Sequence, residues 1–246
     1  MWQEVHSNNQ HHIRQQEASG LRMGVLSAGS FRVLKLQSYL KGQQKCCIHN
    51  KILGQKAVPA LYGVQDCILL GGKVWVDETF IKVRKGDVEK RPDGKEYRGL
   101  SRNQMCIGIA CDRENAVFVF EGYGKTSKKK TLDAFSSHIK EGSHLIHDKE
   151  EGHSALVSKL SLTEEAYDSR KLKGIPDSGN PLDRVNELCN LLQQFLSSHS
   201  GFNRDDIQDY LNLFSVMVNP PHNKYEKVKK ILELGLEKPV LVRFRD

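Results

Sequence analysis

The chain has 246 residues, with 37 Lys and Arg against 30 Asp and Glu, a formal net charge of +7 and a pI near 9.0. This length can bury a core as one domain with a small appendage, and the basic surplus favours a phosphate-rich partner only modestly. No run of about eighteen apolar residues is present, and the N-terminus lacks the apolar centre of a signal peptide, so we expect no membrane partner and a cytoplasmic location.

Residues 1–44 show no sustained hydrophobic period and are rich in Gln, Asn, His, Ser and Gly. We expect a poorly ordered or helical N-terminal segment there. Residues 45–70 are predicted to form a helical linker, which Pro59 ends or kinks. The six cysteines form no C-x-x-C pair, which favours reduced, mostly buried thiols over a zinc site or a disulfide framework.

Residues 73–84 (KVWVDETFIKVR) predict the first β-strand, bounded by glycines on both sides. Asp77 lies in the middle of this apolar run. A buried carboxylate costs several kcal/mol unless it is paired or binds a metal. Asp77 is therefore either a functional residue or a solvated residue at a strand end.

Further strands are predicted at 104–111, 116–120 and 143–147, with a helix over 132–139 capped by Ser127 or Thr131. Strand, strand, strand, helix, strand is the order of a ribonuclease H-like core. The predicted fold is α/β, a mixed five-stranded sheet flanked by helices, with residues 71–218 as the catalytic domain. In this fold the fourth strand lies parallel beside the first, so Asp77 and Asp148 would meet at one edge of the sheet.

The segment 149–180 reads as loop with a short helix near 158–166, and helices are predicted at 182–198, 205–218 and 225–236. Residues 219–246 would form a basic C-terminal helix and tail. A ribonuclease H-like nuclease needs a third metal ligand, besides two acids such as Asp77 and Asp148, from the helix that packs beside the first strand. The helix at 182–198 is the natural place for this ligand. Asn186 and Glu187 lie at similar angles beside its apolar stripe, so amphipathicity does not choose between them; Asp183 is a weaker candidate.

Several ordered blocks make the chain resemble an insertion-sequence transposase of the DDE superfamily, in the ISXO-like group. The blocks are G-x-V-W-V-D-E-T-F at Gly72–Phe80, R-G-L-S-R-N-Q at Arg98–Gln104, L-I-H-D-K-E-x-x-H at Leu145–His153, V-N-E-L-C-N-L-L-Q-Q-F-L at Val185–Leu196, H-S-G-F at His199–Phe202 and Y-L-N-L-F at Tyr210–Phe214. The chain differs from such relatives in lacking a Cys-rich N-terminal ribbon. It also has Gln193 where they tend to carry a Lys.

The resemblance implies a DNA transposase that cleaves and joins strands with two Mg²⁺ or Mn²⁺ ions. Asp77 and Asp148 match the first two ligands, and the V-N start of the later block points to Asn186 as the third, with Glu187 as its rival. The expected partner is double-stranded DNA, both element ends and target, bound by a homodimer or higher oligomer in the bacterial nucleoid. The residues expected to contact DNA are Lys85, Arg98, Arg102, Lys125, Lys128, Lys129, Lys130 and His153.

Two other interpretations remain open from the sequence. One is a truncated, inactive transposase remnant that only binds DNA. The other is a host ribonuclease H-like nuclease, which the blocks after Asn186 make less favoured.

Overall fold

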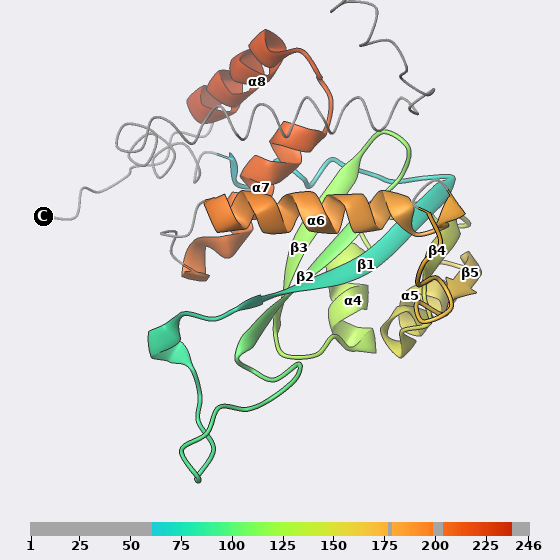
Figure 1. Cartoon of the computed structure of the whole chain (residues 1–246). Coiled ribbons are helices and arrows are strands. Elements are labelled where there is room, and N and C mark those ends of the chain that lie inside the picture. The colour runs from blue at the N-terminus through green and yellow to red at the C-terminus, as the bar shows by residue number, and fades with distance from the viewer. Residues whose placement is uncertain (1–60, 177–178, 199–203, 238–246) are drawn as a thin grey trace, which may run out of the picture. The chain divides into compact units, whose positions relative to one another are not determined.

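The computed structural model describes residues 61–176, 179–198 and 204–237 (Figure 1). The chain divides into two units, residues 1–45 and 46–246, and every described residue belongs to the second. The predictions for residues 1–44, for the linker up to residue 60 and for the tail after residue 237 lie outside the described residues. In the described part, no helix is long and apolar enough to cross a membrane.

A single five-stranded sheet forms the centre of the described unit, in the order β3-β2-β1-β4-β5. β1 (Lys73–Lys82), β2 (Gln104–Cys111) and β3 (Ala116–Tyr123) form an antiparallel meander. β4 (His144–Asp148) pairs with β1 in parallel, and β5 (Thr163–Tyr167) pairs with β4 in parallel. This mixed sheet, flanked by helices, confirms the predicted ribonuclease H-like fold.

Helices cover both faces of the sheet, with α6 (Asp183–Ser198) on one face and α4 (Lys128–Phe135) on the other (Figure 1). α5 (Ser154–Lys159) packs beside α4, α7 (Ile207–Val218) packs on β3, and α8 (Lys224–Glu237) follows. Three short 3₁₀ turns, η2 (Lys85–Asp87), η3 (Glu151–His153) and η5 (Arg204–Asp206), lie between these elements.

Each face of the sheet has its own apolar core because strand side chains alternate between faces. On the α4 side, Val74 and Val76 of β1 pack in a buried cluster with Phe135. On the α6 side, Phe214 of α7 makes ring contacts with Phe118 of β3 at 4.9 Å between centroids and with Phe195 of α6 at 5.2 Å. The sheet thus separates two cores, and the two sides of β1 meet different chemical surroundings.

Side-chain amides form hydrogen bonds with backbone N–H and carbonyl groups on the outer edge of β3, which is an edge strand of the sheet. The Gln65 amide donates to the Phe118 carbonyl and accepts from the Phe118 N–H, at 3.0 and 2.8 Å. Asn219 makes the same two bonds with Ala116, at 2.8 and 2.6 Å, and Gln208 accepts from the Phe120 N–H. These bonds occupy backbone groups that an exposed edge would offer to another chain.

One predicted element is wrong: residues 158–166 do not form a helix. The helix α5 ends at Lys159, and Thr163–Tyr167 forms the edge strand β5. The sequence TEEAY has no apolar alternation because the side chains of β5 are almost all exposed. Pairing with β4 and the bonds from His144 to Thr163 and Glu165 hold it in place.

Gly108 provides a test of the packing between β2 and α4. A Cβ at this position would clash with the Glu121 carboxylate and lie 2.8 Å from the Phe135 ring. We expect Gly108→Ala to lower the free energy of unfolding by about 1–3 kcal/mol, the cost typical of overpacking. Gly86→Ala is the matched control, because nothing lies within 4 Å of its added Cβ. Urea denaturation of both variants checks this; equal stability would contradict the packing described.

Candidate active site

The two predicted acidic ligands lie on neighbouring parallel strands. The β1–β4 register pairs Trp75 with Ile146 and Val76 with His147, so Asp77 and Asp148 are the next residues of each strand. Residues at matched positions of a parallel pair point to the same face. The two residues therefore lie on the α6 side of the β1–β4 pair. Because Asp148 ends β4, one of its carboxylate oxygens also lies within 4.8 Å of an imidazole nitrogen of both His147 and His153.

Burial and like charges act on both carboxylates. Burial, together with the charges of Glu78 and Asp148, raises the pKa of Asp77 to about 7, although the hydrogen bond from the Glu78 N–H lowers it. Burial also raises the pKa of Asp148, and the charge of Glu78 adds to it, whereas His153 lowers it. The pair costs energy when ionised, and a cation between the two side chains would offset that cost.

Three contacts hold α6 and the residues just before it against β1. Trp75 Nε1 donates to the Pro181 carbonyl at 2.9 Å, just before the helix begins. About two and three turns further along the chain, Cys189 Sγ lies 3.9 Å from Asp77 Oδ2, and Gln193 Nε2 donates to Thr79 Oγ1 at 2.6 Å. The face of α6 that carries Cys189 and Gln193 is thus the face above Asp77.

This placement separates the two candidates for the third ligand. At 100° per residue, Asn186 lies about 60° around the helix from Cys189, whereas Glu187 lies about 160° away. The charge of Glu187 acts instead on the pKa of the Cys111 thiol at the end of β2, which burial raises to about 12. Asn186 is therefore nearer to the Asp77 face than Glu187. Its role as a ligand stays a prediction.

A second polar cluster, the Glu78 cluster, lies on the α4 face and was missed from the sequence. It consists of Glu78, Glu121, Thr126, His147 and His153. His153 is fully buried, with Nε2 3.0 Å from Glu78 Oε1 and Nδ1 2.9 Å from His147 Nδ1. The alternation of β1 was the available signal, because it turns Glu78 away from the face of Asp77.

The two histidines of the Glu78 cluster differ in proton affinity. Burial opposes the charged form of His153, but the hydrogen bond and charge of Glu78, together with Asp148 and Asp77, raise its pKa. Burial and the charge of His153 lower the pKa of His147, whose Nε2 lies 3.3 Å from Glu164 Oε2. The charged form is therefore favoured at His153 and disfavoured at His147.

The residues predicted to contact DNA fall into three groups. Six have exposed side chains, namely Lys85, Arg98, Arg102, Lys125, Lys128 and Lys129. Lys130 is half-buried, and its ammonium donates to the carbonyls of Tyr123 and Lys125. His153 has no exposed surface, so the structure places it beneath the acids rather than at a DNA-facing surface.

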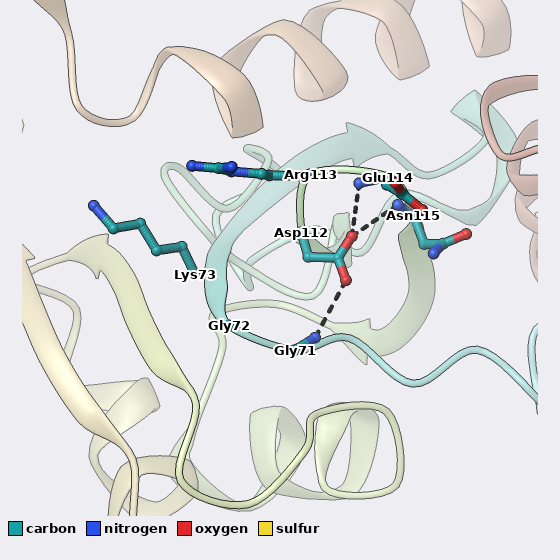
Figure 2. A pocket seen from close by; sticks show the side chains of 7 residues that line it. All are labelled: Gly71, Gly72, Lys73, Asp112, Arg113, Glu114 and Asn115. Atoms are coloured by element: carbon teal, nitrogen blue, oxygen red, sulfur yellow. Dashed lines mark hydrogen bonds between the residues drawn. The ribbon is translucent and has the colours of Figure 1, made fainter.

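A separate shallow pocket lies at the start of β1, away from the acid pair. Gly71, Gly72 and Lys73 line one side, and the β2–β3 turn, Asp112–Asn115, lines the other (Figure 2). The Asp112 carboxylate accepts from the N–H groups of Gly71, Glu114 and Asn115. These bonds fasten the turn to the sheet, and we assign the pocket no chemistry.

The titration of Glu121 should make the stability of the protein depend on pH. Burial and the charge of Glu78 raise its pKa to about 7. Because the pKa is raised, ionising the buried Glu121 carboxyl costs stability, and the protonated form is the stabilising one. The stabilisation by the protonated form is present below about pH 4.5 and is lost as the pH rises through about 7. We expect Glu121→Gln to raise the free energy of unfolding at pH 8 by on the order of 2 kcal/mol, with little change at pH 4.5.

Chemical denaturation at the two pH values measures this difference. Glu141→Gln, at an exposed position, is the control and should change little at either pH. A loss of stability at pH 8 in Glu121→Gln would show that the Glu121 carboxylate is stabilising, contrary to this account.

No protein-family model and no curated protein match the chain, so the predicted insertion-sequence family has no support from a sequence match. Several solved structures are similar in fold, and two of them each cover 58% of the chain. One is the simian T-cell lymphotropic virus intasome in complex with PP2A regulatory subunit B56 gamma, with 12% identity, 48% of that chain covered and a TM-score of 0.36. The other is the HTLV-2 integrase catalytic core domain in complex with magnesium, with 14% identity, 85% covered and a TM-score of 0.34. The fold assignment rests on strand order and register: this chain has a ribonuclease H-like core.

Proposed function

We propose that this protein is a metal-dependent polynucleotidyl transferase, and more narrowly a DNA transposase of an insertion sequence. One observation carries the proposal: the parallel β1–β4 register brings Asp77 and Asp148 to adjacent positions, with Asp77 covered by Cys189 of α6. These acids are 71 positions apart in the sequence, and folding places them together at a cost in buried charge. The blocks of sequence that resemble ISXO-like transposases support the narrower assignment.

The donor set fits Mg²⁺ or Mn²⁺. Asp77 and Asp148 supply carboxylate oxygens, Asn186 can supply a neutral carbonyl oxygen, and oxygen donors are the ligands that Mg²⁺ prefers. The raised pKa values of both acids fit a site whose charge is balanced by a cation. When bound, two such ions supply a nucleophile at neutral pH and stabilise the leaving oxygen of a phosphodiester.

The surrounding residues position and protect the two carboxylates. The Glu78 N–H donates to Asp77 Oδ1 at 2.9 Å, and the Glu150 N–H donates to Asp148 Oδ1 at 3.2 Å, which orients each group. Cys189 and Gln193 of α6 close one side of the site. Gln193 is held by Thr79, so the position where relatives tend to carry a Lys has a neutral side chain at the site.

Three exposed lysines, Lys125, Lys128 and Lys129, are candidates to bind a DNA backbone. Lys125 forms an ion pair of 3.0 Å with Glu150, two residues after Asp148. Lys128 and Lys129 occupy the first turn of α4, where the helix dipole disfavours cations. Lysines at this helix end destabilise the helix slightly, and binding phosphate would compensate for that cost.

Strand cleavage and joining test the proposed activity. Linear duplexes carrying the sequences that flank the gene are incubated with the full chain and Mg²⁺ or Mn²⁺, and nicked and joined products are separated on denaturing gels. We expect Asp77→Asn and Asp148→Asn to abolish both products, because each removes a charged ligand. Asn186→Ala should weaken the activity, and Asn186→Asp should keep it.

Asp133→Asn, an exposed position on α4, is the matched control and should retain full activity. Glu187→Gln should also be active if Asn186 is the third ligand. DNA binding without any product, unchanged by Asp77→Asn, would favour the alternative of a remnant that only binds DNA.

The salt dependence of DNA binding tests the basic segment separately. Each phosphate neutralised on duplex DNA contributes about −0.9 to the slope of log K against log salt concentration. We therefore expect the double variant Lys128→Gln/Lys129→Gln to make the slope less negative by about 2. Fluorescence anisotropy with a labelled duplex measures it, with the exposed pair Lys171→Gln/Lys173→Gln as control. An equal slope in both double variants would exclude α4 from the interface.

A further inference from the structure

The two buried histidines of the Glu78 cluster are arranged around a common point. His147 and His153 are 3% and 0% exposed, and their Nδ1 atoms lie 2.9 Å apart. Each Nε2 faces a carboxylate, Glu164 for His147 and Glu78 for His153. Imidazoles whose Nε2–H groups donate to carboxylates present unprotonated Nδ1 atoms, so two lone pairs meet. A cation must lie between them, either a proton or a metal ion.

The pattern also matches how proteins prepare histidine ligands for a metal. A ligating imidazole usually donates its other N–H to a carboxylate, which fixes the ring and raises its basicity. Both histidines here have that partner. The Asp148 carboxylate completes the set, because one ligand atom from each of His147, Asp148 and His153 lies within 4.8 Å of the other two.

The distance between the two nitrogens fits coordination at adjacent positions. An ion about 2.0–2.1 Å from both Nδ1 atoms, the usual distance for zinc and imidazole, would see them at an angle of about 90° when they are 2.9 Å apart. Two histidines that meet an ion at this angle, together with one carboxylate, suit a divalent transition metal whose other coordination positions stay open. Mg²⁺ fits poorly, because it prefers oxygen ligands.

We propose that His147, His153 and Asp148 form a binding site for a divalent transition-metal ion, distinct in chemistry from the oxygen-ligand site and joined to it through Asp148. An ion held there would fix η3 against the end of β4 and so orient Asp148 from the α4 side. The site goes beyond the proposed function, since metal binding by the histidines does not require the chain to act on DNA.

Co²⁺ is the probe, because nitrogen ligation gives it visible absorption bands. The full chain, with accessible thiols alkylated and excess Mg²⁺ present, is titrated with Co²⁺ and the bands are followed. We expect saturable binding that His153→Asn removes. Alkylation keeps cysteine thiolates from supplying the signal. Mg²⁺ competes for the all-oxygen set of Asp77, Asp148 and Asn186, whereas the two imidazoles still select Co²⁺.

Glu164 and Glu165 of β5 offer a matched pair of substitutions that leave the core intact. Glu164 supports His147 inside the cluster, whereas Glu165 bonds the half-exposed His144, and both carboxylates are exposed. We expect Glu164→Gln to weaken Co²⁺ binding by about 10–100-fold, the usual cost of losing such a partner, and Glu165→Gln to leave it unchanged.

Equal Co²⁺ affinity in Glu164→Gln and Glu165→Gln would overturn the proposal, as would bands that persist in a folded His153→Asn variant. Should His153→Asn fail to fold, the Glu164 and Glu165 pair decides. Failure of this site is distinguishable from failure of the proposed function, because the readout needs no DNA and both glutamate variants keep Asp77, Asp148 and Asn186.

Discussion

The parallel pairing of β1 with β4 is the constraint on which the rest of the site depends. Its register places two carboxylates from distant parts of the chain side by side on a largely buried face. Such a placement is unfavourable for the metal-free protein, because burial and mutual repulsion both oppose ionisation. The sheet order, the position of α6 and the turn after β4 all serve to hold this arrangement.

Strand alternation gives β1 a different set of polar side chains on each side of the sheet. Asp77 and Thr79 face α6, where Cys189 and Gln193 contact them, while Glu78 turns to the opposite core and meets His153 and Thr126. His153 lies close enough to act on the pKa of Asp77 and of Asp148 as well. The two polar clusters are therefore electrostatically coupled through the end of the β1–β4 pair.

Much of the fold followed from patterns in the sequence. The apolar runs of β1 and β2 and the apolar stripe of α6 predicted these elements closely, since each buries a regular face. β5 could not be found this way, because an exposed edge strand buries no face and its sequence carries no alternation.

The site was predictable only in part. Asp77 stood out as a charge within an apolar strand, and the topology supplied Asp148. The choice between Asn186 and Glu187 needed the rotation of α6 about its axis, which depends on contacts with Asp77 and Thr79 and not on local sequence. The burial of His153 is likewise a tertiary feature, because η3 packs against α4 and the side chain contacts Glu78 and His147. The sequence suggested a surface role for it instead.

The proposed function requires Asp77 and Asp148 to bind a divalent cation together, through their carboxylate oxygens. Isothermal titration of the full chain with Mg²⁺, compared with Asp77→Asn, Asp148→Asn and Asp133→Asn, tests it most directly. We expect saturable Mg²⁺ binding by the unmodified chain and by Asp133→Asn, and no binding by Asp77→Asn or Asp148→Asn. Unchanged Mg²⁺ binding in Asp77→Asn would contradict it.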